Sequence, residues 1–244
     1  MVVVVLGMHR ARTSLVANVL HHLGVHIGDR LLGANAWNPY GHWEDLDFLE
    51  LNVEMLKAAG GDWANPPSTL RIRATAEWFG PEVRALVDWK RKQGRPAWGW
   101  KDPRTCLTAW AYHGYLRAED EVRYVHVVRR QEDIVDSLMR RQVGALAMVE
   151  GWIAEGRVTE EEAVKDREMA GWTADRWTAL VHEYELRVCG FLAEEQPLVM
   201  TVDTDLMMRG KEWARSAVGD LAHYLDVRDE GVIEGAAARI ETGD

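Results

Sequence analysis

The sequence predicts an α/β fold with three layers, in which helices cover both faces of a central, mainly parallel sheet. The chain begins with a short run of β-branched residues, Val2 to Leu6, which has no polar alternation and therefore suits a strand buried on both faces. A loop and a helical pattern follow this run at once. Further along, short apolar runs keep alternating with helical stretches, as expected for parallel strands joined by right-handed crossovers.

The first helix is predicted from Thr13 to Leu23, because apolar residues recur there every four positions and a glycine follows. A second helix is predicted to start near Glu44 and to end at Gly60. Its apolar face is expected to consist of Leu46, Leu49, Val53 and Leu56.

The later elements continue the alternation. We expect helices over 76–93, 131–141, 159–195 and 212–225, a short aromatic strand in "AWGWKDPRT", and strands over 122–128 and 197–203. The last residues, 234–244, are expected to fray. Since the chain has no internal repeat and no low-complexity linker, one domain is predicted for residues 1–244.

Composition narrows the classes of function. Lys and Arg number 29 against 39 Asp and Glu, and the resulting net charge of −10 argues against a protein that coats nucleic acid. The two cysteines have no metal-like spacing, which favours a reducing compartment over a disulfide framework. No stretch approaches the roughly 18 apolar residues of a membrane span. We therefore expect a cytoplasmic protein whose partners include neither a membrane nor a nucleic acid.

The loop "GMHRARTS" joins the first strand to the first helix, where backbone N–H groups can point at one anion. A nucleotide-kinase loop there reads GxxxxGK[ST], with a lysine for the phosphates and a hydroxyl for Mg²⁺. In this chain Arg12 stands in place of the second glycine and Thr13 in place of the lysine. Gly7, Arg10 and the hydroxyls of Thr13 and Ser14 remain, which indicates an anion site without an evident metal.

Four segments resemble those of PAPS-dependent sulfotransferases, and they occur in the family's order over about residues 2–142. "GMHRARTSLV" resembles the 5′-phosphosulfate loop, which in bacterial members commonly reads GMHRSGTSLL. "NPYGHWED" resembles the segment with the acceptor-side acid, and "WGWKDPRT" the KDP segment shared with tyrosylprotein-type members. "VHVVRRQEDIVDSLMRR" resembles the 3′-phosphate motif, and "VMTVDTDL" weakly resembles a later segment.

The resemblance implies a P-loop-like fold that transfers a sulfuryl group from 3′-phosphoadenosine 5′-phosphosulfate (PAPS) to an acceptor hydroxyl or amine, by in-line displacement and without a metal. Within the loop that starts at Gly7, it implies that Arg10 contacts the moving sulfuryl group. Thr13 and Ser14 would donate hydrogen bonds to the 5′-phosphate, or would simply cap the helix.

At the other end of the donor, the resemblance implies that Arg129 and Ser137 bind the 3′-phosphate. Arg129 comes at the end of a predicted strand, which is where open α/β sheets bind ligands. Lys101 would neutralise charge on the bridging oxygen, or would pair with the neighbouring Asp102.

The same resemblance implies that Glu44 takes the proton of the acceptor, although an acid in the first turn of a helix is also favoured by the helix dipole. His42 and His9 are the alternative bases. Asp102 and Arg104 are expected to hold each other in place.

The loop departs from the family at Ala11 and Arg12, where Ser-Gly is usual. A left-handed backbone is unfavourable for residues other than glycine. Either the loop therefore takes a regular helical start, or Arg12 serves the ligand.

The acceptor is expected to be a small molecule, a glycan or a peptide, bound beside a helical segment at about 140–195. Four tryptophans would line an aromatic acceptor site or pack in the core: Trp37, Trp43, Trp98 and Trp100.

Two other functions remain open. A small-molecule kinase would use ATP and Mg²⁺, with Asp203 at a strand end, but the loop lysine is missing. A degenerate nucleotide-binding or scaffold protein would bind a ligand without transfer, or would bind none.

Overall fold

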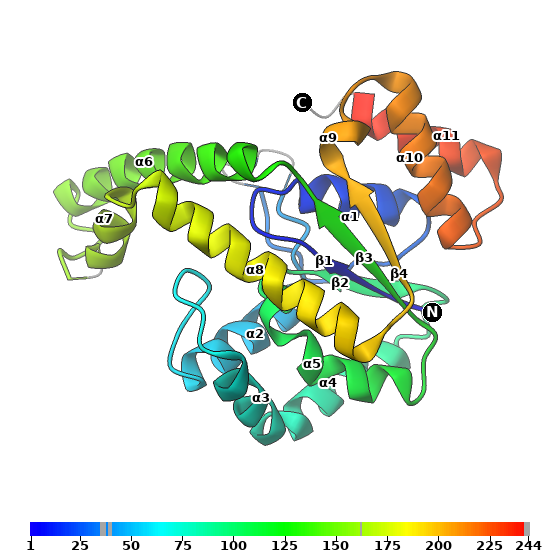
Figure 1. Cartoon of the computed structure of the whole chain (residues 1–244), viewed down its shortest axis with the longest axis horizontal. Helices are drawn as coiled ribbons and strands as arrows, with labels where there is room; N and C mark the ends of the chain where they lie inside the picture. Colours follow the sequence, from blue (N-terminus) through cyan, green and yellow to red (C-terminus); the bar gives the residue numbers. More distant parts are fainter. Residues whose placement is uncertain (35–37, 39–40, 162, 242–244) are drawn as a thin grey trace. The chain divides into compact units, whose positions relative to one another are not determined.

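The computed structural model describes residues 1–34, 38, 41–161 and 163–241. Within that part of the chain, the sheet has four strands in the order β2-β1-β3-β4, and all of them are parallel (Figure 1). The predicted α/β fold, with a parallel sheet between helices, is confirmed, and each strand lies in a segment predicted as a strand. The strands are β1 (Val2–Leu6), β2 (Trp98–Lys101), β3 (Val122–Val128) and β4 (Val199–Asp203).

The chain divides into two compact units, and the prediction of one domain for the whole chain stays a prediction. The first unit comprises Met1–Arg129 and Tyr184–Asp244, and the second Arg130–Glu183. The first unit contains the sheet and the helices α1 (Thr13–His22), α2 (Leu46–Ala58), α3 (Thr69–Trp78), α4 (Gly80–Lys92), α5 (Thr105–Arg117), α9 (Thr204–Met207), α10 (Lys211–Tyr224) and α11 (Glu230–Glu241). The second contains α6 (Gln131–Ala154) and α7 (Val164–Ala170), and α8 (Ala174–Glu195) runs from the second into the first.

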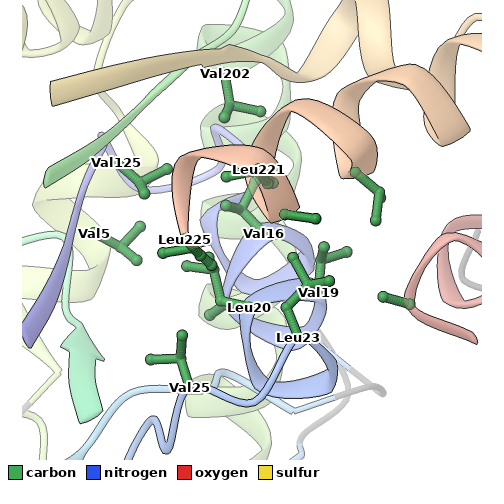
Figure 2. Close-up of a cluster of buried hydrophobic side chains, with 14 of the residues drawn as sticks. Val5, Val16, Val19, Leu20, Leu23, Val25, Val125, Val202, Leu221 and Leu225 are labelled. Atoms are coloured by element: carbon green, nitrogen blue, oxygen red, sulfur yellow. The ribbon is translucent and has the colours of Figure 1, made fainter. Parts of the chain in front are cut away.

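One face of the sheet packs against α1 and α10, and α11 joins the same apolar cluster by packing on these two helices (Figure 2). Val5, Val125 and Val202 come to this cluster from three neighbouring strands, and Leu20 and Leu221 come from α1 and α10. Burial of such side chains contributes about 1.5–3 kcal/mol each. Because β1 and α1 are both buried here, the loop between them is anchored at both ends.

The opposite face of the sheet carries α2 and α5. Val4 is in register with Trp100 on one side and Tyr124 on the other, so the three side chains share this face. Phe48 of α2 stacks on Trp100 with ring centroids 4.0 Å apart and an interplanar angle of 1°. Helices thus cover both faces, as predicted from the unbroken apolar run of β1.

The predicted apolar face of α2 is partly wrong. Val53 is 42% exposed, and Leu46 and Leu49 are only partly buried. The stacking of Phe48 on Trp100 turns a different face toward the sheet. That face consists of Phe48, Leu51, Asn52, Met55 and Leu56.

Three helical predictions have different bounds in the structure. The stretch 76–93 belongs to two helices, α3 and α4, which meet at Phe79. Helix α6 continues beyond residue 141 to Ala154, and the charged stretch 159–195 contains both α7 and α8.

The expectation that residues 234–244 fray is wrong as far as Glu241, where α11 ends. Ala236, Ala237 and Ile240 are buried in the cluster with α1 and α10. This tertiary packing supplies the stability that the local sequence lacks. In the described part of the chain, no helix combines the length and the apolar character needed to cross a membrane.

Candidate functional site

Two predicted anion-binding segments meet at the carboxyl edge of the sheet. The chain leaves the neighbouring strands β1 and β3 toward opposite edges, and ligands of open α/β sheets bind where such loops diverge. The loop with Arg10 follows β1, and Arg129 directly follows β3. The Arg129 Nη1 group donates a hydrogen bond to the Arg10 carbonyl oxygen at 2.9 Å. We call Arg10, Arg12 and Arg129 together the arginine site.

The loop between β1 and α1 has a left-handed backbone at two residues other than glycine. Arg10 has a φ of 68° and Arg12 a φ of 62°, a region that costs such residues about 1–2 kcal/mol each. Arg12 is the N-cap residue of α1, and its left-handed backbone is a conformation that glycine adopts most easily. The alternative of a regular helical start is therefore wrong for its backbone. Strain of this kind persists only where surrounding contacts hold it.

Asp205, at the start of α9, makes the main contact that holds the strained loop between β1 and α1. The Arg12 Nη1 group donates a hydrogen bond to Asp205 Oδ1 at 2.9 Å, and Arg129 Nε lies 3.6 Å from the same oxygen. The Arg12 side chain therefore points to α9, and one carboxylate orients two arginines. This contact stabilises the loop.

The neighbouring Thr204 joins the loop to the end of β3. Its wholly buried Oγ1 lies 3.2 Å from the Ala11 carbonyl oxygen and 3.1 Å from that of Val128. Asp203 begins this turn, and its side chain accepts hydrogen bonds from the backbone N–H groups of residues 205 and 206. We call the segment 203–205 the β4 clasp. In the structure, Asp203 is thus a helix cap.

Gly7 is required by close packing. A Cβ atom at Gly7 would lie 2.7 Å from Thr13 Cγ2 and 2.9 Å from the Val127 carbonyl oxygen. Its N–H group donates to the Sγ atom of Cys106 at 3.0 Å, inside the core. The N–H group of Gly7 is therefore directed at the core, whereas the glycine was predicted as part of the phosphate loop. Burial raises the pKa of the Cys106 thiol, which stays neutral there.

Lys101, at the end of β2, contacts the start of α1. Its Nζ atom donates to Glu44 Oε1 at 2.8 Å, to the His42 carbonyl oxygen at 2.9 Å and to Ser14 Oγ at 3.3 Å. The Ser14 hydroxyl itself lies 2.9 Å from the same His42 oxygen. An ammonium has three donors, so all three N–H groups of Lys101 have partners. The His42 carbonyl occupies a position where an anion oxygen would accept the same hydrogen bonds.

Asp102 and Arg104 complete a buried group of four charges with Lys101 and Glu44, and we call these four residues the acid–base cluster. The predicted pair is present: Arg104 Nη1 lies 2.6 Å from Asp102 Oδ1, and 3.6 Å from Glu44 Oε2. Two cations and two carboxylates sum to zero charge. Such compensation is expected, because an unpaired charge inside a protein is costly.

The two carboxyl groups of the cluster have opposite pKa shifts. Burial raises the pKa of Glu44, but the charge and hydrogen bond of Lys101 outweigh burial and bring it below its ordinary value. Burial dominates at Asp102, where it exceeds the attraction of Arg104, and the pKa of Asp102 is raised. Glu44 is therefore the more acidic of the two carboxyl groups.

The histidines and the serine predicted from the sequence have different surroundings. The His9 ring lies 4.7 Å from the ring of Trp63 and 6.1 Å from that of Tyr184, centroid to centroid. His42 contributes its backbone carbonyl to Lys101 and Ser14. Ser137 lies on α6 in the second unit, so its pairing with Arg129 stays a prediction.

The four tryptophans singled out in the sequence also have different surroundings. Trp98 and Trp100 are buried and stack with Phe48, which is the core-packing alternative. Trp43 lies against His21, with ring centroids 5.1 Å apart. Trp37 lies outside the described residues.

Sequence reasoning noted the segment 199–206 and Asp203 but missed the contacts of Thr204 and Asp205 with the loop. It also missed Asn52, which donates to Asp102 from α2 at 2.8 Å. A signal existed for the clasp. Thr204 and Asp205 follow a predicted strand, and the ends of parallel strands share one edge of the sheet. Asn52 had no such signal, because its partners come from a helix and a turn 50 or more residues away.

In comparisons with known proteins, no family model matches the chain, and a search of curated proteins returns no matching relative.

Proposed function

We propose that this protein is a PAPS-dependent sulfotransferase, which moves a sulfuryl group to a hydroxyl or amine of a small molecule, a glycan or a peptide in the cytoplasm. The observation that carries the proposal is the hydrogen bond between Arg129 and the Arg10 carbonyl. It brings the two segments that resemble the 5′- and 3′-phosphate motifs to one point of the sheet edge. The free thiols of Cys106 and Cys189 suit a reducing compartment.

The donor nucleotide would bind across the arginine site. Arg129 matches the family's 3′-phosphate contact, and Arg10 the contact to the sulfuryl group. The N-terminus of α1 supplies backbone N–H groups for the 5′-phosphate. Arginine guanidinium groups suit the phosphates of a bisphosphate, although the chain as a whole is acidic.

Lys101 would act on the transferring group. The His42 carbonyl accepts hydrogen bonds from Lys101 and Ser14 in the structure, so an oxygen of the donor would replace that carbonyl on both groups. The two donors then face an anion oxygen, and Lys101 stabilises the charge that develops on the bridging oxygen.

The reaction is a single in-line displacement. The bond between the acceptor oxygen or nitrogen and sulfur forms as the bond between sulfur and the phosphate oxygen breaks, and 3′-phosphoadenosine 5′-phosphate leaves. Glu44 receives the acceptor proton. Its lowered pKa makes it a weak base, which suits a loose transition state in which the proton leaves late.

Calorimetric titration with 3′-phosphoadenosine 5′-phosphate and with adenosine 5′-phosphate, without Mg²⁺, tests the donor site. A charge-assisted contact to the 3′-phosphate is worth about 1.5–3 kcal/mol, so the bisphosphate should bind about 10- to 150-fold more tightly. Arg129→Gln should remove this preference and leave the affinity for adenosine 5′-phosphate almost unchanged. Labelled PAPS and a panel of hydroxyl and amine acceptors then test transfer.

Each alternative function predicts a different result. Stabilisation by ATP that requires Mg²⁺, without binding of the bisphosphate, would identify a kinase. Binding of the bisphosphate without transfer to any acceptor would identify a nucleotide-binding protein, and equal affinity for the two nucleotides would remove Arg129 from the proposed role.

A further inference from the structure

A buried hydrogen-bond network connects the core to the acid–base cluster, and Asn52 of α2 is at its centre. The Asn52 side chain has no exposed surface. Its Nδ2 atom donates to Asp102 Oδ2 at 2.8 Å and to Thr105 Oγ1 at 3.2 Å. Its Oδ1 atom accepts from Thr108 Oγ1 at 2.6 Å and from Tyr112 Oη at 2.9 Å.

This network determines the orientation of the amide. A side-chain amide has two N–H donors and two lone pairs on its oxygen, and all four have partners here. A rotated amide would turn its oxygen toward the carboxylate of Asp102 and its N–H groups toward two hydroxyls. The observed orientation therefore directs a donor at Asp102.

The network continues through Asp102 into the cluster. The second oxygen of Asp102 accepts from the backbone N–H of Arg104 at 3.3 Å and from its Nη1 at 2.6 Å. The same Nη1 is 3.6 Å from Glu44, which in turn binds Lys101. The Asp102 carboxylate thus lies between Asn52 and Arg104, and Arg104 lies between the two acids.

We propose that Asn52 is a positioning residue, which holds Asp102 as the ionised partner of Arg104 and so leaves Glu44 to Lys101. This pairing of Asp102 with Arg104 and of Glu44 with Lys101 does not depend on which substrate the protein binds. The effect of Asn52 on turnover rests on the proposed sulfuryl transfer, in which Lys101 acts.

Loss of the amide has a direct electrostatic consequence. Asp102 is completely buried, and burial already raises its pKa. Without the donor from Asn52 it binds a proton, and Arg104 then turns to Glu44. Lys101 then shares Glu44 with Arg104 and loses part of its counter-charge.

Five titratable groups face Asp102 from the surrounding elements: Glu44, Arg104, Cys106, Tyr112 and Tyr184. Burial raises the pKa of the thiol and of both phenols, so those three groups stay neutral. The pH dependence of the variants therefore reports the carboxyl groups.

Three variants test the proposal. Asn52→Leu removes the donor at constant size, and Asn52→Asp replaces it with a carboxyl. Tyr112→Phe removes one hydroxyl on the other side of the amide and serves as the matched control for lost stability. We expect Asn52→Leu to lower kcat by up to about 100-fold and to leave the KM for PAPS nearly unchanged, whereas Tyr112→Phe should leave kcat within about twofold.

Asn52→Asp adds a pH-dependent rescue. Its new carboxyl and Asp102 share one proton, and the apparent pKa of the pair lies above that of an ordinary carboxyl. Below that pKa the shared proton replaces the amide donor, and above it two carboxylates repel each other. Turnover of Asn52→Asp relative to the native protein should therefore fall as pH rises, whereas the defect of Asn52→Leu should persist at every pH.

A measurement without substrate separates this proposal from the proposed function. Competitive acetylation, followed by mass spectrometry, measures the reactivity of the Lys101 amine. It should increase in Asn52→Leu and stay at the native level in Tyr112→Phe. Equal Lys101 reactivity in both variants, or a pH-independent defect in Asn52→Asp, would overturn the role of Asn52. Absence of sulfuryl transfer from the native protein would instead reject the proposed function.

Discussion

The arginine site and the acid–base cluster share one edge of the sheet but differ in how deeply their charged side chains are buried. The Lys101 and Glu44 side chains are 3% and 6% exposed, whereas Arg12 is 28% exposed. Because buried charges are costly unless they are compensated, the cluster is neutral and each cation in it has a carboxylate partner. In the arginine site, Arg12 is closer to water, and its ion pair with Asp205 is partly exposed. In the proposed function, the arginine site would supply affinity for the donor, and the cluster would supply Lys101, which acts on the transferring group.

The two sites also differ in where strain is stored. The arginine site contains left-handed backbone at Arg10 and Arg12, held by the β4 clasp. The cluster is held by hydrogen bonds from side chains that are themselves buried. Changes at the arginine site should therefore have modest effects on stability, and changes in the cluster should have large ones.

The largest effect is expected from Lys101→Met, which leaves Glu44 buried beside Arg104 alone. Removing one member of a buried ion pair costs about 3–5 kcal/mol, and turnover should fall by about 10²- to 10³-fold. Urea unfolding measures the first quantity, and single-turnover transfer the second. Equal stability of the variant and the native protein would show that Glu44 does not depend on Lys101.

The pH dependence of stability should change sign in the same variant. In the native protein the pKa of Glu44 is lowered, so its contribution to stability is present above the ordinary carboxyl pKa and is lost as pH falls through the lowered value. Without Lys101, we expect burial to outweigh the remaining attraction of Arg104 and to raise the pKa of Glu44 above its unfolded value. The contribution is then present at acidic pH and is lost as pH rises. Unfolding free energies measured across the acidic range distinguish the two cases.

An intermediate effect is expected from Asp205→Asn, which removes the carboxylate shared by Arg12 and Arg129. The ion pair is partly exposed, so we expect a loss of about 1 kcal/mol in the free energy of unfolding. Asp203→Asn is the matched control, because it removes the same charge two residues away and keeps an oxygen that can cap α9. If both variants lose equal stability, the contact of Asp205 with the arginines contributes nothing.

The smallest effect, and the sharpest test of backbone strain, comes from position 12. Arg12→Gly loses the ion pair but relieves a strain of about 1–2 kcal/mol, whereas Arg12→Ala loses the ion pair and keeps the strain. The glycine variant should therefore be the more stable of the two by about 1 kcal/mol, although alanine is the better residue inside a helix. The opposite order in thermal unfolding would contradict the left-handed conformation of Arg12.

The sequence by itself predicted the elements whose signals are local. The β-branched run Val2 to Leu6, the apolar spacing of α1 and the run at 122–128 each determine an element without help from distant residues. Because the ends of parallel strands share one edge of the sheet, the sequence also indicated that Arg10 and Arg129 lie at the same edge. Their hydrogen bond requires β1 and β3 to be neighbours in the sheet, which only the tertiary structure decided.

Only the tertiary structure decided which face of α2 is buried, that α11 is helical to Glu241, and which partners surround Asp102. Each of these depends on side chains far apart in the sequence, and packing against them outweighs local preference. The left-handed backbone of Arg12 is the clearest case. Its own residue type argues against that conformation, and the contacts that hold it come from a turn more than 190 residues later in the chain.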